Sequence, residues 1–166
     1  MTALDLSISR AGPESAAEVH RLTKRAFGGY TWLTPPSGAI DETEDDVRRD
    51  LQQHGGALAR LDGTPVACLR FVVEPNVLRV RRVAVEPDRQ GAGIGRALMR
   101  WAESYASGHG FLEIRLSVRG QLPGNRRFYE GLGYRVVREV PFPGTRDVHW
   151  LEMARALDGR SGRLSS

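Results

Sequence analysis

Several residue types are scarce in this sequence, and each shortage excludes a class of protein. Cys68 is the only cysteine, so an internal disulfide and a multi-cysteine zinc site are both excluded. No apolar run approaches the roughly 18 residues that cross a bilayer, which argues against a membrane protein. The first ten residues, MTALDLSISR, lack a basic segment followed by an apolar one, so we expect no secretory signal peptide. Together these features predict a cytoplasmic protein.

Histidine is also sparse, and its spacing does not suggest a metal site. No two of the four histidines are separated by the three to five residues typical of ligand pairs, so we expect no bound metal. The four are His20, His54, His109 and His149. The single thiol, on Cys68, is expected to be a small buried side chain on a strand.

The length of 166 residues corresponds to one domain. The composition, 40% hydrophobic and 27% charged, is ordinary for a soluble globular protein. We expect residues 1–157 to form a single domain. The polar segment 158–166 is expected to be a flexible tail.

The charge is basic and almost entirely arginine. Of 24 basic residues only Lys24 is a lysine, and the net charge is +4. Arginine presents a planar fork that suits phosphate, so the anionic partner is either a nucleic acid or a phosphorylated cofactor. A basic stripe with interleaved aromatic residues, which nucleic-acid binding favours, is lacking. We therefore expect no nucleic-acid partner.

Apolar residues alternate between a period of two and a period of about 3.6 along the chain, which separates strands from helices. Strands are predicted near residues 4–9, 57–61, 65–73, 77–85, 112–118, 134–139 and 147–153. Helices are predicted at residues 13–27, from a cap at Asp41, at 94–105 and at 124–132, with a loop at 28–39. The dipeptide Asp62-Gly63 predicts a hairpin. The order β-α-α-β-β-β-α-β-α-β-β predicts a mixed α/β or α+β sheet with helices packed on it.

A glycine-rich loop is the most informative feature. The stretch from Arg82 to Arg96 reads RVAVEPDRQGAGIGR, with glycines at 91, 93 and 95 between a predicted strand and a predicted helix. Glycine lets the backbone turn sharply and lets a ligand approach closely. The first amides of a helix have no partner within it and form an anion site. Arg89 and Arg96 would add positive charge. Alternatively, the three glycines form only a turn and bind no ligand.

Two familiar phosphate motifs do not fit this loop. A P-loop requires Gly-Lys-Ser/Thr, whereas Arg96-Ala97 follows the last glycine, and a dinucleotide fingerprint requires glycine at position 96. The spacing Gln90-x-x-Gly93-x-Gly95 instead resembles the pyrophosphate loop of the GNAT superfamily of acyl-CoA-dependent N-acyltransferases. The segment from Asn125 to Tyr134, NRRFYEGLGY, resembles the later motif of that family, Asn-x-x-x-Tyr-x-x-x-Gly-Phe/Tyr.

The resemblance implies a GNAT-like fold, a mixed and mostly antiparallel central sheet of about seven strands flanked by about four helices. It implies that the backbone of Val83 and Val85 binds the pantetheine arm of acetyl-CoA, which Asn125 also contacts. Tyr129 would be the general acid that protonates the departing CoA thiolate. The pyrophosphate would bind the amides of Gln90, Gly91, Ala92, Gly93, Ile94, Gly95 and Arg96.

The implied activity is N-acetyl transfer from acetyl-CoA, a co-substrate, to a primary amine by direct attack in a ternary complex. A tyrosine with a pKa near 10 keeps its proton at neutral pH and can donate it to a thiolate whose conjugate acid has a pKa of about 8.5. The acceptor would be a small-molecule or peptide amine, and a homodimer is possible by analogy with the family. The alternative is a non-catalytic acyl-CoA-binding regulatory module.

Several roles stay open at this stage. Some family members place a glutamate, which acts as the general base, where Arg79 stands here. The base that removes the proton from the amine is therefore undefined in this sequence. Its candidates, beside water-mediated transfer, are Glu74, Asp147, His149 and Glu152. Tyr129 could merely pack its ring, and Asn125 could be a helix cap. The acids from Asp41 to Asp50, including Asp45 and Asp46, are either a solvated face or an attraction for a cationic amine. Tyr30 and Trp32 either line the acceptor pocket or cover the core.

Overall fold

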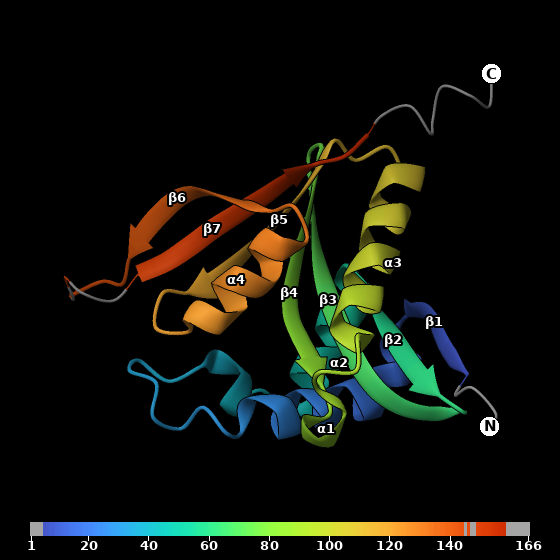
Figure 1. Ribbon diagram of the computed structural model, residues 1–166. Helices are drawn as coiled ribbons and strands as arrows, with labels where there is room; N and C mark the ends of the chain where they lie inside the picture. The colour runs from blue at the N-terminus through green and yellow to red at the C-terminus, as the bar shows by residue number, and fades with distance from the viewer. Residues whose placement is uncertain (1–4, 145, 147–148, 159–166) are drawn as a thin grey trace. The chain divides into compact units, whose positions relative to one another are not determined.

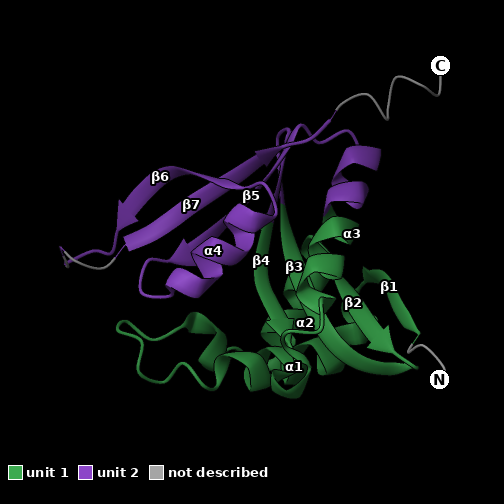
Figure 2. Ribbon diagram, viewed as in Figure 1, with its two compact units in different colours: residues 1–72, 80–102 green, residues 73–79, 103–166 purple. Residues whose placement is uncertain are grey.

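The computed structural model describes residues 5–144, 146 and 149–158, and the chain divides into two compact units (Figures 1 and 2). Unit 1 contains residues 1–72 and 80–102, and unit 2 contains residues 73–79 and 103–166. The chain passes between the units inside strand β3, strand β4 and helix α3. Leu4, Asp147 and residues 159–166, on which parts of the sequence predictions fall, lie outside the described residues.

The element order agrees with the sequence prediction. The strands are β1 (Leu6–Ala11), β2 (Gly56–Leu61), β3 (Thr64–Glu74), β4 (Val77–Val85), β5 (Glu113–Arg119), β6 (Arg135–Pro141) and β7 (His149–Ala156). The α-helices are α1 (Ala16–Phe27), α2 (Glu44–Gln53), α3 (Ile94–Gly108) and α4 (Pro123–Gly131). Three single 3₁₀ turns are η1 (Pro13–Ser15), η2 (Gly38–Ile40) and η3 (Pro87–Arg89).

The seven strands form one sheet in the order β1-β2-β3-β4-β5-β7-β6. The pairs β1–β2, β2–β3, β5–β7 and β6–β7 are antiparallel, whereas β4 and β5 are parallel. The mixed, mostly antiparallel seven-stranded sheet with four helices confirms the predicted fold class.

In unit 1 the predicted hairpin joins β2 to β3. Asp62 has a φ of 49° and Gly63 a φ of 84°, so both central residues are left-handed. This is the turn that matches the right-handed twist of two antiparallel strands, and Asp-Gly is one of its preferred sequences.

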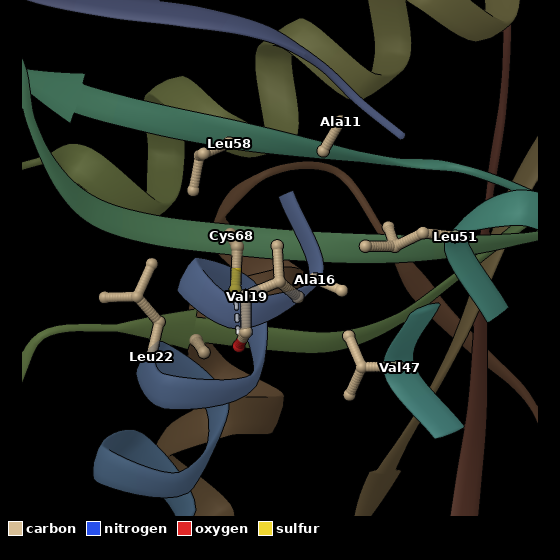
Figure 3. Packing of buried hydrophobic residues seen from close by; sticks show 9 residues of the cluster. Ala11, Ala16, Val19, Leu22, Val47, Leu51, Leu58 and Cys68 are labelled. Atoms are coloured by element: carbon tan, nitrogen blue, oxygen red, sulfur yellow. Dashed lines mark hydrogen bonds between the residues drawn. The ribbon is translucent and has the colours of Figure 1, made fainter. Parts of the chain in front are cut away.

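Helices α1 and α2 cover one face of the unit 1 strands. Val19 and Leu22 of α1 and Val47 of α2 pack on Leu58 and Cys68 (Figure 3). Cys68 is fully buried, as expected, and its burial raises the pKa of the thiol to about 11. The thiol is therefore protonated at neutral pH and is not a nucleophile.

The first part of α3 packs on the opposite face. Phe71 of β3 stacks on Trp101 of α3 with ring centroids 6.3 Å apart. Phe71 and Cys68 are three residues apart on one strand, so their side chains point to opposite faces. Apolar residues therefore cover both faces of the strand that precedes β4.

The start of α2 differs from the prediction. Thr43, not Asp41, is the N-cap: its hydroxyl accepts the Asp46 amide at 3.1 Å, and the Asp46 carboxylate accepts the Thr43 amide at 2.9 Å. This reciprocal capping box satisfies two amides at the helix start. Asp41 instead ends η2.

Unit 2 contains β5, β6, β7, α4 and the end of α3. Its buried residues include Ile114, Leu116 and Met153. The β7 strand begins at His149 in the described residues. No helix in the described part of the chain is long and apolar enough to span a membrane.

Candidate functional site

The glycine loop follows β4 and η3 and leads into α3, as the sequence predicts. Gly91 has a φ of 84° and Gly93 a φ of 83°, and a Cβ at either position would have no heavy atom within 4 Å. The space is open, but the backbone conformation costs an L-residue roughly 1–2 kcal/mol. Glycine is therefore favoured at both positions by the backbone conformation rather than by crowding.

The amides at the start of α3 lie where the sequence predicts an anion site. The first helical hydrogen bond runs from the Ala97 amide to the Gly93 carbonyl at 3.1 Å. The amides of Ile94, Gly95 and Arg96 precede it and have no partner within the helix. The helix dipole adds positive potential at this end. Gln90, Gly91, Ala92, Gly93, Arg89 and Arg96 are all exposed.

Replacing Gly93 with alanine tests this loop. If the loop binds acetyl-CoA, as the sequence predicts, Gly93→Ala should weaken that binding at least about tenfold, because the loop must leave its left-handed turn and a methyl group approaches the ligand. Gly63→Ala is the matched control, since Gly63 has a similar φ, 84°, and equally open surroundings in the β2–β3 turn. Both variants should lose about 1–2 kcal/mol of stability. Equal acetyl-CoA affinity of the two variants in calorimetry would contradict the assignment.

The strand that enters the loop carries an unusual backbone at Arg82, whose φ is 54°. Positive φ is uncommon for a residue with a side chain and locally redirects the strand. Val83 and Val85 follow and are half-buried, while Ala84 between them is buried in the α1–α2 core. The register of β4 with β5 covers Val77–Arg79, so the edge at Val83 and Val85 lies outside it. The Gln90 side chain reaches back to the Val85 carbonyl at 3.4 Å.

Glu86 ties the end of β4 to α1 and was missed by sequence analysis. It is buried, its amide donates to the Val66 carbonyl at 2.8 Å, and its carboxylate accepts Arg25 Nε at 2.9 and 3.0 Å. Arg21 adds a longer ion pair at 3.7 Å. Because Glu86 directly precedes η3, these bonds fix where the glycine loop starts.

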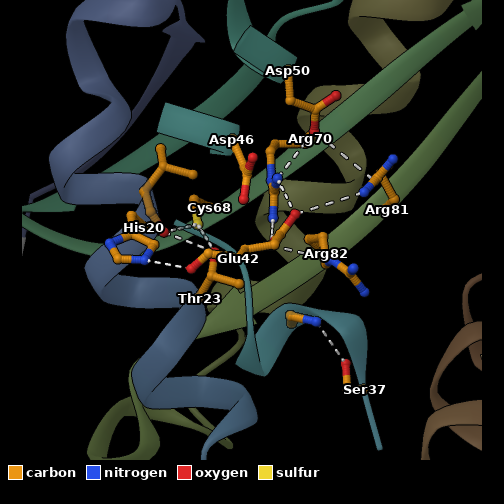
Figure 4. Close-up of polar contacts among 12 residues, drawn as sticks. His20, Thr23, Ser37, Glu42, Asp46, Asp50, Cys68, Arg70, Arg81 and Arg82 are labelled. Atoms are coloured by element: carbon orange, nitrogen blue, oxygen red, sulfur yellow. Dashed lines mark hydrogen bonds and ion pairs between the residues drawn. The ribbon is translucent and has the colours of Figure 1, made fainter. Parts of the chain in front are cut away.

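The acidic segment 41–50 is engaged by arginines of unit 1. Arg70 is fully buried and donates to Glu42 at 2.7 and 3.0 Å and to Asp50 at 3.0 Å (Figure 4). Burial raises the pKa of Glu42, but the hydrogen bonds and charge of Arg70 outweigh it and hold the pKa below its ordinary value. Asp45 and Asp46 pair with Arg48 and Arg49 of the same helix.

These partners give most of the acids a structural role. The attraction of a cationic amine by Asp45 and Asp46 stays a prediction, and their ion pairs weaken it because the charges are already compensated. Trp32 is 59% exposed, so it does not cover the core, whereas Tyr30 packs edge-on against Phe27 at 6.1 Å.

In unit 2, α4 carries the second motif. Tyr129 is buried, with its ring edge-on to Phe128 at 5.0 Å and to Tyr134 at 5.9 Å. Asn125 is exposed in the first turn of α4. Leu122 is the N-cap and no side chain caps this helix, so the reading of Asn125 as a cap is wrong. The packing of Tyr129 is real and is compatible with a catalytic hydroxyl.

Tyr134 has a different role from its neighbour. Its hydroxyl donates to Glu103 at 3.0 Å, and Arg155 pairs with the same carboxylate. Burial and the Glu103 charge raise the pKa of Tyr134 above its ordinary value. Because the Tyr134 hydroxyl is committed to Glu103, it is a poor proton donor for a reaction.

Two of the four base candidates are held by arginines. Glu74 accepts Arg79 at 2.7 Å. Glu152 is buried and accepts bonds of 3.1 to 3.3 Å from Arg79, Arg115 and Arg138. Burial raises the pKa of Glu152, but the hydrogen bond and charge of Arg79 and the other arginines lower it further, so the net pKa is depressed. A carboxylate with a depressed pKa is a weak base.

The other two base candidates are His149 and Asp147. His149 is half-buried at the start of β7, opposite Pro141 of β6. Asp147 lies outside the described residues. No cluster of three or more histidine, cysteine, aspartate or glutamate side chains suited to a metal occurs in the part of the chain that is described.

The depressed pKa of Glu152 predicts a pH-dependent contribution to stability. Its contribution is fully present above the unfolded pKa, close to 4.5, and is lost as the pH falls through the lower folded pKa. Glu152→Gln should therefore lose about 2 kcal/mol of unfolding free energy at pH 7. The loss should shrink steadily below about pH 4.

Urea titrations of both proteins at several pH values measure this difference. A gap in stability that is constant from pH 7 to pH 3 would contradict the ion-pair account.

The predicted site residues thus fall into two groups. Unit 1 holds the strand edge at Val83 and Val85 and the loop from Gln90 to Arg96, and unit 2 holds Asn125 and Tyr129 on α4. The residues that the sequence did not reveal are Glu86, Arg70 and the Tyr134–Glu103 pair. Their partners are distant in sequence, so only the fold identifies them.

Comparison with known proteins covers most of the chain. A family model described as the acetyltransferase (GNAT) family matches residues 17–134. The mycothiol acetyltransferase of Kocuria rhizophila is 27% identical over 106 residues, which are 64% of this chain and 32% of that protein. The chain therefore spans about a third of the length of that curated relative.

Solved structures share the fold. The ribosomal-protein-S18-alanine N-acetyltransferase of Escherichia coli superposes with a TM-score of 0.75 at 19% identity, over 93% of this chain and 95% of that one. The PaiA N-acetyltransferase of Thermoplasma acidophilum, solved with coenzyme A, gives 0.74 at 18% identity, over 92% and 99%. Both identities are low enough to speak for the fold alone. The family model, however, covers more than half of the chain and includes the glycine loop and the α4 motif. The chain belongs to the acetyltransferase (GNAT) family.

Proposed function

We propose that this chain transfers an acetyl group from acetyl-CoA to a primary amine, with residues 1–157 acting as one catalytic domain. The observation that carries the proposal is the loop of left-handed glycines that ends on the amides of Ile94, Gly95 and Arg96, which have no partner within α3. These amides would bind the pyrophosphate, with Arg89 and Arg96 adding charge. The pantetheine arm would run along the strand edge at Val83 and Val85 and meet Asn125.

The amine would attack the thioester carbonyl directly. A C–N bond forms and the C–S bond breaks, and the electron pair of that bond stays on the CoA sulfur. Tyr129 would donate its proton to this sulfur as the thiolate leaves. Tyr129 stands at the first tyrosine position of the second motif, whereas the Tyr134 hydroxyl donates to Glu103.

The attacking amine must lose a proton before or during attack. Glu74 and Glu152 are paired with arginines, so neither is well suited to accept it. We propose that water carries the proton away, which is consistent with the absence of a glutamate at position 79.

Two measurements test the proposal and separate it from a non-catalytic acyl-CoA-binding module. CoA should raise the melting temperature of the protein under both readings, since a ligand that binds only the folded state stabilises it. Release of free thiol from acetyl-CoA in the presence of a broad panel of amines is expected only of the enzyme. Stabilisation by CoA without thiol release for any amine would favour the binding module.

A further inference from the structure

Three arginines of unit 1 surround two carboxylates beside the strand that leads to the glycine loop. Arg70 of β3 makes the short bonds to Glu42 and Asp50, at 2.7 to 3.0 Å (Figure 4). Arg81 and Arg82 of β4 approach the same carboxylates only at longer range. Arg81 lies 3.8 Å from Glu42 and 4.0 Å from Asp50, and Arg82 lies 3.5 Å from Glu42.

The two outer arginines therefore keep hydrogen-bonding capacity. Among the described residues, neither Arg81 nor Arg82 donates a hydrogen bond, and Arg82 Nε is buried without one. Three guanidinium groups against two carboxylates leave one positive charge in excess (3 − 2 = 1). The Arg82 side chain is 20% exposed and the Arg81 side chain 39%, so both reach solvent. Burying part of a guanidinium that makes no hydrogen bond to an anion costs free energy, so such an arrangement is unusual.

The position of Arg82 relates this charge to the reaction, and this step rests on the proposed function. If the pyrophosphate binds the loop and the arm runs back along Val85 and Val83, the acetyl end reaches the level of the next residue, Arg82. The left-handed backbone of Arg82 marks that point of the strand.

The Arg82 guanidinium also faces the loop before α2. Its Nη2 atom lies 3.1 Å from where a Cβ of Gly38 would stand, so the group rests against η2. η2 follows Tyr30 and Trp32, for which lining the acceptor pocket is one of the two predicted roles. The excess charge thus lies between the acetyl end of the cofactor site and the expected acceptor loop of the same unit.

We propose that the acceptor carries an oxyanion, in the simplest case a carboxylate, beside the amine that is acetylated, and that Arg82 binds it with help from Arg81. A guanidinium pairs with carboxylate or phosphate oxygens through two parallel hydrogen bonds, and such charge-assisted bonds are strong. The acids of α2 favour the same conclusion, because Glu44, Asp45, Asp46 and Asp50 already pair with Arg48, Arg49 and Arg70 and offer little charge to a polyamine.

Matched acceptor pairs test the proposal on the full chain with acetyl-CoA. Each common amino acid is compared with its own carboxamide, and 2-aminoethyl phosphate is compared with ethanolamine. Spermidine represents the polyamines. The readout is the ratio of kcat/KM for the anionic member to that of the neutral member, which does not depend on how much of a preparation is active. The wild-type ratio should be at least about ten for one class of pair. The first pairs report a carboxylate and the second a phosphate.

Arg82→Gln should bring that ratio close to one, Arg81→Gln should lower it less, and Arg82→Lys should keep part of it. Arg49→Gln, at an exposed position on α2, is the matched control and should retain the full ratio. Acetyl-CoA affinity, measured separately by calorimetry, should stay unchanged in Arg82→Gln.

The outcomes are distinct. A preference for neutral amines or spermidine, a preference that survives in Arg82→Gln, or no turnover of any anionic amine overturns the inference while leaving the proposed function intact if acetyl-CoA still binds and other amines react. Failure of acetyl-CoA to bind the wild-type protein overturns both.

Discussion

Tyr129→Phe should lower kcat by about a hundredfold while leaving the affinity for acetyl-CoA nearly unchanged. Loss of a positioned general acid typically costs two to four powers of ten. The phenylalanine ring keeps the edge-on contacts with Phe128 and Tyr134, so the packing of α4 is preserved. Steady-state rates with the best amine of the panel, together with calorimetry for acetyl-CoA, measure the two effects separately.

Tyr134→Phe is the matched control for this variant. The residue lies in the same motif, but its hydroxyl serves Glu103, so its removal should cost about 1 kcal/mol of stability and little of kcat. If Tyr129→Phe retains full turnover, Tyr129 is a packing residue and the general-acid role is lost. If both variants lose kcat equally, the effect belongs to the fold of α4 rather than to a proton.

Arg70→Met should destabilise the folded protein by about 3–5 kcal/mol. Arg70 is fully buried, and its removal leaves Glu42 and Asp50, with side chains 13% and 16% exposed, without their shortest hydrogen bonds. The large penalty comes from the carboxylates left behind rather than from the net strength of the ion pairs. Urea unfolding at neutral pH measures the loss.

Two further variants make this prediction specific. Arg49→Met removes an exposed arginine of α2 and should change stability by less than about 1 kcal/mol. Adding Asp50→Asn to Arg70→Met should recover part of the lost stability, because Asp50 is then neutral while Glu42 still faces Arg82 at 3.5 Å and Arg81 at 3.8 Å. A double variant less stable than Arg70→Met alone would show that packing, not charge, sets the penalty.

Local patterns were enough to predict most of the fold. The Asp62-Gly63 turn, the alternation in β4 and β5, and the helical face of α3 each depend on residues close in sequence. The start of α2 was placed too early because Asp41 and Thr43 are both acceptable caps. The choice is made by Asp46, whose carboxylate returns the bond of Thr43, and such reciprocity is visible only once the helix exists.

The candidate site likewise has parts that the local sequence predicts and parts that only the fold reveals. The glycine loop and the α4 motif are continuous stretches, so their spacing could be interpreted directly. Arg70 looked like one more charged strand residue, because Glu42 and Asp50 reach it only through folding. The left-handed backbone of Arg82 was equally hidden, since the surrounding residues read as an uninterrupted strand.

Binding of the diphosphate by the glycine loop is tested most directly by one calorimetric comparison, S-acetyl-4′-phosphopantetheine against S-acetylpantetheine, which differ only in a phosphate at the diphosphate position. If the amides of Ile94, Gly95 and Arg96 hold the diphosphate, the phosphorylated compound should bind at least about tenfold more tightly. Equal affinities, or no heat with acetyl-CoA, would contradict the account.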